Sequence, residues 1–138
     1  MIQIGFGEKL KIQQDDLKLS GHAIECRINA EDHNKDFMPW PGAITKLSLP
    51  SGSGVRFDSM LFEGYEVPLF YDSLLGRLIV WDSDRDCVMK KLERVLDSLV
   101  IEGIPTTIDL HKKLVIDKDV AASDVDIEFL EKWLQEKF

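Results

Sequence analysis

The residues of this 138-residue chain that are best suited to chemistry lie together in Glu25-Cys26-Arg27-Ile28-Asn29. In a β-strand successive side chains point to opposite faces, so Glu25, Arg27 and Asn29 would share one face. A guanidinium held by a neighbouring carboxylate can present its remaining N–H groups to a carbonyl or an oxyanion. A purely structural ion pair on the sheet surface is the competing interpretation, and residue types alone favour it.

Two further segments place polar groups next to apolar or glycine-rich runs. Asp72 is expected either to cap the turn that follows it, the more frequent role of aspartate, or to orient Arg27. Ser51-Gly52-Ser53-Gly54 lacks the GK[ST] ending of a phosphate-binding loop and is interpreted as a hairpin turn. Arg56, on the outward face of the next strand, is expected to be solvated or to contact a partner subunit.

No metal site and no nucleophile arrangement is predicted. The three histidines are scattered, and the Asp32-His33 pair has no third ligand at a useful spacing. Cys26 belongs to the apolar face of its strand, which argues against a catalytic thiol. Because Cys26 and Cys87 form no CxxC pair, we expect two reduced thiols in a cytosol-like compartment.

The composition excludes several classes of protein. The formal net charge of -8 argues against a nucleic-acid surface, which needs clustered lysine and arginine. No apolar run approaches the roughly 20 residues of a membrane span, and the start of the chain does not resemble a secretory signal. A cytoplasmic protein is therefore expected, with the mitochondrial matrix as the alternative if the parent protein is eukaryotic.

The pattern of apolar residues predicts an α+β fold, with a mainly antiparallel β-sheet followed by packed helices. Alternation over residues 21–29 indicates a strand that buries the side containing Cys26 and Ile28. Further strands are predicted at Ala43–Leu49, Val55–Asp58 and Arg77–Trp81.

Three helices are expected in the second half of the chain. In the first, Ser83 is the expected N-cap, and Gly103 and Pro105 are expected to end the helix. The second covers about 107–115 and the third about 126–137. The third helix is expected to place four apolar residues on one face: Ile127, Leu130, Trp133 and Leu134.

One segment, GHAIECRINAED at residues 21–32, is closely similar to the strand that opens the C-terminal lobe of biotin carboxylases. The similarity continues in order through FMPWPG (37–42), GSGVR (52–56), GYEVP (64–68), YDS (71–73), Arg85 and GIPTT (103–107). Residues 1–12 resemble the tail of a helix in the preceding ATP-grasp region. The resemblance therefore implies a boundary between residues 1–12 and a C-terminal domain at 13–138, of the rudiment single hybrid motif type.

The resemblance also implies roles for individual residues. Biotin carboxylases use ATP and bicarbonate to carboxylate N1 of biotin on a carrier protein. Arg27 matches the family arginine that holds the ureido oxygen of biotin and stabilises the biotin enolate, with Glu25, Asn29 and Asp72 as supporting residues. Arg56 matches a position at the family's dimer interface.

The resemblance implies, finally, what a lobe of this kind lacks. The glycine-rich loop over ATP, the acids that bind Mg²⁺ and the group that binds bicarbonate lie upstream in this family. We therefore expect no ATP or metal site on this chain, no carboxylase activity from it alone, and three partners: the ATP-grasp lobes, a biotin carrier protein and a second copy. The alternative is a non-catalytic module of the same fold that dimerises or docks a carrier domain.

Overall fold

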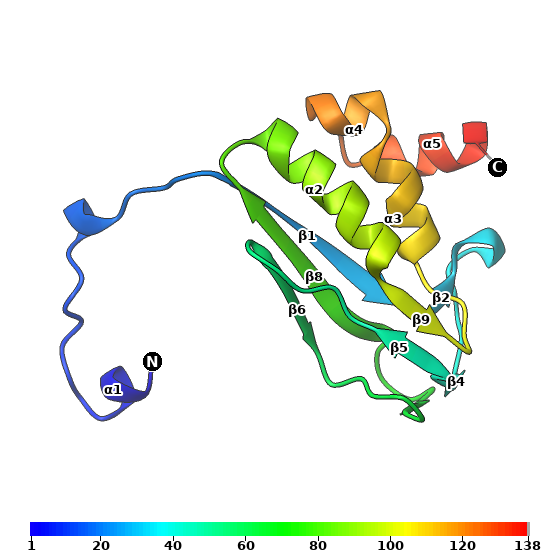
Figure 1. Ribbon diagram of the computed structural model, residues 1–138, viewed down its shortest axis with the longest axis horizontal. Coiled ribbons are helices and arrows are strands. Elements are labelled where there is room, and N and C mark those ends of the chain that lie inside the picture. The colour runs from blue at the N-terminus through cyan, green and yellow to red at the C-terminus, as the bar shows by residue number, and fades with distance from the viewer. Residues whose placement is uncertain (138) are drawn as a thin grey trace.

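The computed structural model describes residues 1–137 and is organised around a three-stranded antiparallel sheet. Its strands are β1 (His22–Asn29), β8 (Leu74–Asp82) and β6 (Val55–Ser59), in the order β1-β8-β6. Helix α2 (Arg85–Ser98) packs across one face of this sheet, as Figure 1 shows. The other face carries exposed side chains of β1, β8 and β6, so the sheet has one covered and one open face.

Three small two-stranded sheets extend this core. They pair β2 (Glu31–Asp32) with β3 (Met38–Pro39), β4 (Gly42–Ala43) with β7 (Glu66–Val67), and β5 (Lys46–Ser48) with β9 (Val100–Glu102). All three pairs are antiparallel. The chain continues into α3 (Ile108–Val115), α4 (Lys118–Ala122) and α5 (Phe129–Lys137). The predicted α+β fold, with antiparallel strands first and packed helices later, is confirmed.

The hydrophobic core lies between the sheet and α2. The largest fully buried side chains are Ile28, Ile44, Leu78, Val80, Val88 and Leu96. On β1, Cys26 and Ile28 are buried whereas Glu25 and Arg27 are exposed, so the predicted alternation is confirmed. Burial of Cys26 raises the pKa of its thiol to about 12, which keeps this thiol protonated and unreactive.

The first 20 residues are all exposed and form only two short turns of helix, α1 (Ile2–Gly5) and η1 (Gln14–Asp16). Figure 1 shows this segment standing apart from the sheet and the helices. No helix within residues 1–137 is long and apolar enough to cross a bilayer.

Helix α2 differs from the predicted helix at both ends. Its N-cap is Asp84 and not Ser83, because the Asp84 carboxylate accepts a hydrogen bond from the backbone N–H of Cys87 (2.8 Å). The predicted end at Gly103 and Pro105 is wrong, since α2 ends at Ser98 and β9 follows. The partner of β9 is β5, some 50 residues earlier, and a local pattern contains no trace of such a pairing.

Two other predicted boundaries also change. The single strand expected at 43–49 is divided between β4 and β5, which belong to different sheets. The last helix begins at Phe129, because the Asp126 carboxylate accepts a hydrogen bond from the backbone N–H of Glu128 and holds a turn there. Ile127 is consequently fully exposed and was wrongly assigned to the apolar face, whereas Trp133 is buried as expected.

Candidate functional site

Arg27 lies on the open face of the sheet, near the end of β1. Half of its side chain is exposed, and its Nη2 atom is 3.9 Å from Oδ2 of Asp72. The second oxygen of Asp72 accepts a hydrogen bond from the backbone N–H of Leu74 (2.9 Å). Asp72 therefore holds its own turn and also faces Arg27, so its two expected roles are compatible. At 3.9 Å the pair is an electrostatic contact, which leaves the guanidinium N–H groups available to a ligand.

A second guanidinium lies directly across the sheet from Arg27. Arg77 on β8 is the cross-strand partner of Arg27, and Asp58 on β6 is the partner of Arg77. Oε1 of Glu25 is 3.9 Å from Nε of Arg77, so the structure places Glu25 beside Arg77. Like charges directly opposite each other repel, and the flanking carboxylates of Glu25, Asp58 and Asp72 offset that repulsion.

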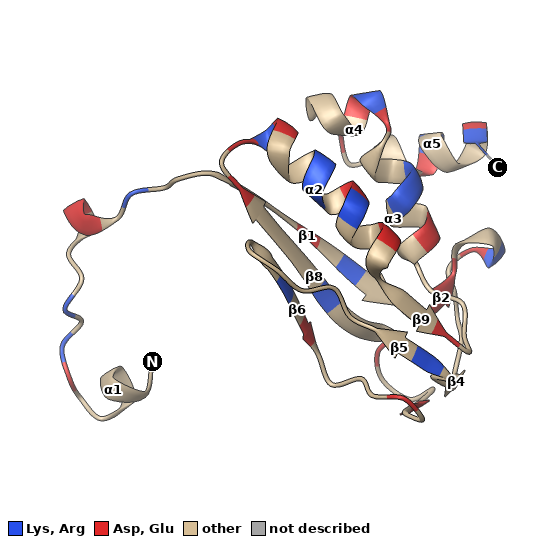
Figure 2. Ribbon diagram, viewed as in Figure 1, with Lys and Arg blue, Asp and Glu red and all other residues tan. Residues whose placement is uncertain are grey.

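Figure 2 shows basic positions on all three strands of this sheet. The third is Arg56 on β6, whose Nε donates to Oδ1 of Asp58 at 2.7 Å. This hydrogen bond holds the pKa of the Asp58 carboxyl below its usual value. Because 72% of the Arg56 side chain is exposed, it also remains accessible to a partner on the open face.

Asn29 supports the site indirectly. Its Nδ2 donates to Oε1 of Glu31 (3.1 Å), and the same oxygen accepts a short hydrogen bond from the Ser73 hydroxyl. The backbone N–H of Ala30 also donates to the carbonyl of Ser73 (2.7 Å). The turn that contains Asp72 is thus tied to the end of β1. Glu31 was not singled out from the sequence, although it lies within the motif at residues 21–32.

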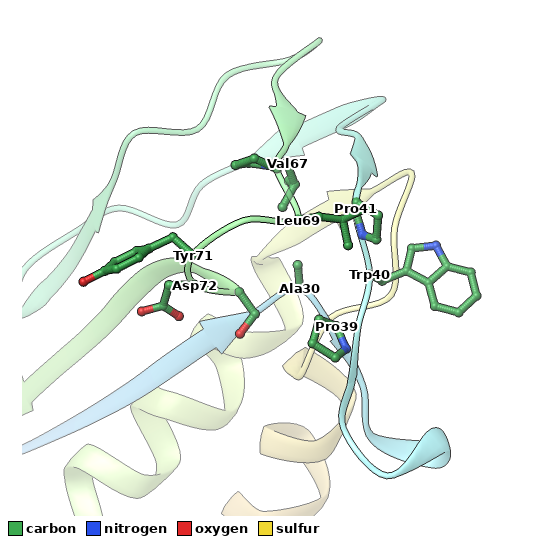
Figure 3. Close-up of a pocket in the computed structure, with 10 residues that line it drawn as sticks. Ala30, Pro39, Trp40, Pro41, Val67, Leu69, Tyr71 and Asp72 are labelled. Atoms are coloured by element: carbon green, nitrogen blue, oxygen red, sulfur yellow. The ribbon is translucent and has the colours of Figure 1, made fainter.

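A cavity of about 210 Å³ opens beside Asp72. Its walls are formed by Ala30, Pro39, Trp40, Pro41, Val67, Pro68, Leu69, Tyr71, Asp72 and Ser73. Figure 3 shows Tyr71 and Asp72 on one side, the Pro39–Pro41 segment on the other, and Ala30 between them. The walls are mostly apolar, and Asp72, one of the few polar residues among them, lies 3.9 Å from Arg27, an arrangement typical of sites for small organic groups.

The Asp32-His33 pair, the one weak metal motif of the sequence, lies in a turn outside the three-stranded sheet. Among residues 1–137, no group of three or more His, Cys, Asp and Glu side chains is arranged to hold a metal ion. The Asp32 carboxylate accepts a hydrogen bond from the backbone N–H of Asn34 (3.0 Å) and lies 3.6 Å from Nζ of Lys35. Asp32 therefore organises its own turn, beside the 3-10 helix η2 (His33–Lys35).

Comparisons with known proteins are consistent across sequence and structure. The family model described as biotin carboxylase C-terminal domain matches residues 25–132. A biotin carboxylase of Pseudomonas aeruginosa is 48% identical over 134 residues, which are 97% of this chain and 30% of that protein. A chloroplastic biotin carboxylase of Arabidopsis thaliana is 45% identical over 135 residues, 98% of this chain and 25% of that protein.

Two solved structures show the same fold. The biotin carboxylase subunit of a pyruvate carboxylase superposes with a TM-score of 0.94 at 37% identity, over 97% of this chain and 30% of that one. The biotin carboxylase domain dimer of Hydrogenobacter thermophilus 2-oxoglutarate carboxylase, in complex with MgADP, ADP and bicarbonate, gives a TM-score of 0.93 at 37% identity, covering 95% and 29% of the two chains. The chain spans less than a third of the length of these relatives.

Proposed function

Since the chain belongs to the biotin carboxylase C-terminal domain family, we propose that it forms the C-terminal lobe of an ATP-dependent biotin carboxylase. In this proposal the guanidinium of Arg27 holds the ureido oxygen of biotin. It stabilises the negative charge that develops there when N1 loses its proton. Biotin arrives as a substrate on a carrier protein, and bicarbonate supplies the carboxyl group.

One observation carries this proposal: Arg27 is half exposed on the open sheet face, 3.9 Å from Asp72 and beside the cavity that Asp72 lines. A cation fixed in advance near developing negative charge needs little reorganisation during the reaction. By analogy with the loss of one oxyanion donor, such an arginine contributes roughly 3 kcal/mol to transition-state stabilisation. Arg77, opposite Arg27, strengthens the positive potential of this face.

The rest of the reaction depends on parts outside this chain. We assign the binding of ATP, Mg²⁺ and bicarbonate to ATP-grasp lobes joined to this one, because the solved biotin carboxylase domain that holds MgADP and bicarbonate is a longer chain, of which this one covers 29%. Residues 1–12 then belong with those lobes. Arg56, on the open face, is assigned to contact a second copy of the enzyme. A cytoplasmic enzyme is the simplest setting for its free thiols, Cys26 and Cys87.

The proposal is tested in a full-length biotin carboxylase that carries this chain as its C-terminal lobe. Arg27→Ala should lower the turnover of biotin carboxylation by roughly 10²- to 10³-fold, the effect of removing one oxyanion donor. The affinity of Arg27→Ala for Mg-ATP should stay unchanged. Arg94 is exposed on α2, and the control variant Arg94→Ala should keep both the turnover of carboxylation and the affinity for Mg-ATP. Equal losses of carboxylation and ATP binding in Arg27→Ala would contradict the assigned role.

The dependence on other lobes is tested with the 138-residue chain alone. Isothermal titration with Mg-ATP should give no measurable binding, and incubation with ATP, bicarbonate and free biotin should give no ADP. Micromolar binding of Mg-ATP would overturn the assignment of the nucleotide site to other lobes.

A further inference from the structure

The backbone of Arg27 is held by a helix about 80 residues later in the chain. The carbonyl oxygen of Arg27 accepts hydrogen bonds from Oγ1 of Thr107 (3.2 Å) and from Nε2 of His111 (2.9 Å). Two residues on, the backbone N–H of Asn29 donates to Oγ1 of Thr107 (3.0 Å), and the N–H of Thr107 donates to the carbonyl of Asn29 (3.1 Å). Four hydrogen bonds thus join the start of α3 to one short stretch of β1.

This stretch of β1 needs support that the sheet does not give. Within the described residues, β1 pairs with β8 alone, so its other edge would leave backbone groups without partners. The register also shifts between Ile28 and Asn29, where the partner residue moves from Gly76 to Leu74. Irregularities of this kind bend a strand and redirect its side chains. The direction of the Arg27 side chain therefore depends on how the edge of β1 is held at this point.

Thr107 and His111 suit this task by their chemistry. A hydroxyl can donate one hydrogen bond and accept another, and Thr107 does both while only 4% exposed. A carbonyl can only accept, so Nε2 of His111 carries a proton. Burial lowers the pKa of His111, against the opposing effect of the Arg27 carbonyl, so the ring is neutral near pH 7 and its Nε2–H tautomer makes this contact.

We propose that Thr107 and His111 are positioning residues of the carboxylation reaction, which aim the Arg27 guanidinium at the ureido oxygen by holding the Arg27 main chain. This inference rests on the proposed function of Arg27. Neither side chain would touch biotin, ATP or bicarbonate. Their effect would appear only in the step that uses Arg27.

The experiment compares two threonines that are neighbours in the chain. Thr107→Val removes the hydroxyl at nearly constant volume. Thr106→Val is the matched control, because among the described residues Oγ1 of Thr106 has one hydrogen bond, which it accepts from the nearby N–H of Ile108 (3.4 Å), and none with β1. In the full-length enzyme, Thr107→Val should lower kcat for biotin carboxylation roughly ten- to hundredfold, the effect expected of a misplaced catalytic group. Bicarbonate-dependent ATP cleavage without biotin should not change, and Thr107→Ser should restore carboxylation.

The outcomes separate the two proposals. If Thr107→Val behaves like Thr106→Val while Arg27→Ala is inactive, the positioning role is wrong and the proposed function stands. If Arg27→Ala itself carboxylates biotin normally, the proposed function fails and this inference fails with it. A parallel fall in carboxylation and biotin-independent ATP cleavage would show general damage and would overturn the positioning role.

A second pair of variants covers the case in which Thr107→Val does not fold, as judged by thermal unfolding. His111 is half-buried, so its replacement disturbs the core less. His111→Leu should lower kcat for carboxylation, whereas His111→Gln, which keeps an N–H donor at similar reach, should retain it. Equal activity of these two variants would overturn the role of His111.

Discussion

Replacing Gly103 by alanine should destabilise this lobe more than the same change at another glycine of similar backbone conformation. Gly103 follows β9 and has a φ of +109°, a value that residues with a side chain rarely adopt. A Cβ atom at this position would lie far inside van der Waals contact with the carbonyl oxygen of Ala43, and 2.9 Å from the amide nitrogen of Thr45. Both of these are main-chain atoms beside a hydrogen bond between Thr45 and Glu102, so neither can rotate away.

The expected loss of unfolding free energy has two causes, the backbone conformation and the lack of space for a methyl group. A residue with a side chain at an unfavourable positive φ costs about 1–3 kcal/mol. Forcing an extra methyl group into filled space costs about 1–3 kcal/mol more. Gly103→Ala should therefore lose about 2–6 kcal/mol of unfolding free energy. Gly64 has a φ of +87°, and among the described residues no atom beyond its two chain neighbours lies within 4 Å of the position that a Cβ would take. Gly64→Ala should therefore show the cost of the positive φ alone, about 1–3 kcal/mol.

Urea unfolding of the 138-residue chain, followed by tryptophan fluorescence, measures both variants on the same scale. The chain contains three tryptophans, and Trp133 is buried, so unfolding should change the signal. Mutational effects on stability usually add within about 0.5 kcal/mol. If Gly103→Ala and Gly64→Ala lose the same unfolding free energy within that margin, the close approach of Gly103 to Ala43 is refuted. A smaller loss in Gly103→Ala than in Gly64→Ala would refute the reasoning as a whole.

Two further predictions concern α2 and the thiols. The hydrogen bond from the Cys87 N–H lowers the pKa of Asp84, so the stability it gives is present above the ordinary pKa of 3.8 and is lost as pH falls through the lowered value. Asp84→Ala should therefore unfold at lower temperature than wild type at pH 7, and the difference should shrink in acid, as followed by circular dichroism. At neutral pH, iodoacetamide should label exposed Cys87 in the native protein and buried Cys26 only after denaturation; equal labelling by mass spectrometry would contradict this.

The elements that the sequence predicts well are those whose signal is local. Strand β1 alternates over eight residues because one face is covered by α2 and the other is open. Helix α2 repeats its buried residues every three or four positions, so its existence, though not its ends, could be predicted. Short elements carry no such signal. Strands β4 and β7 have two residues each and exist only through pairing with each other.

The helices after α3 depend on one aspartate whose role could not be predicted from the sequence. Asp117 accepts hydrogen bonds from the backbone N–H groups of Asp119 and Val120, which begins the unpredicted helix α4. Its second oxygen accepts a hydrogen bond from Nε1 of Trp133 (2.9 Å), which fastens α5 to the same point. The sequence around Asp117 does not indicate which of the many possible roles of an aspartate it has. Its contact with Trp133, 16 residues later, becomes visible in the structure.

In the candidate site, residue types indicate some contacts between side chains but not the contacts that hold the main chain. A contact between Arg27 and Asp72 was one of two roles expected of Asp72 from its residue type, with capping the favoured one, and the structure has Asp72 in both positions. Glu25 was expected to support Arg27, but the antiparallel register brings Arg77 opposite Arg27, and Glu25 lies beside Arg77. The contacts of Thr107 and His111 reach the Arg27 carbonyl, a group that every residue possesses. No pattern of residue types can predict such a contact, so the parts of a site that aim a catalytic group through its backbone become visible only in three dimensions.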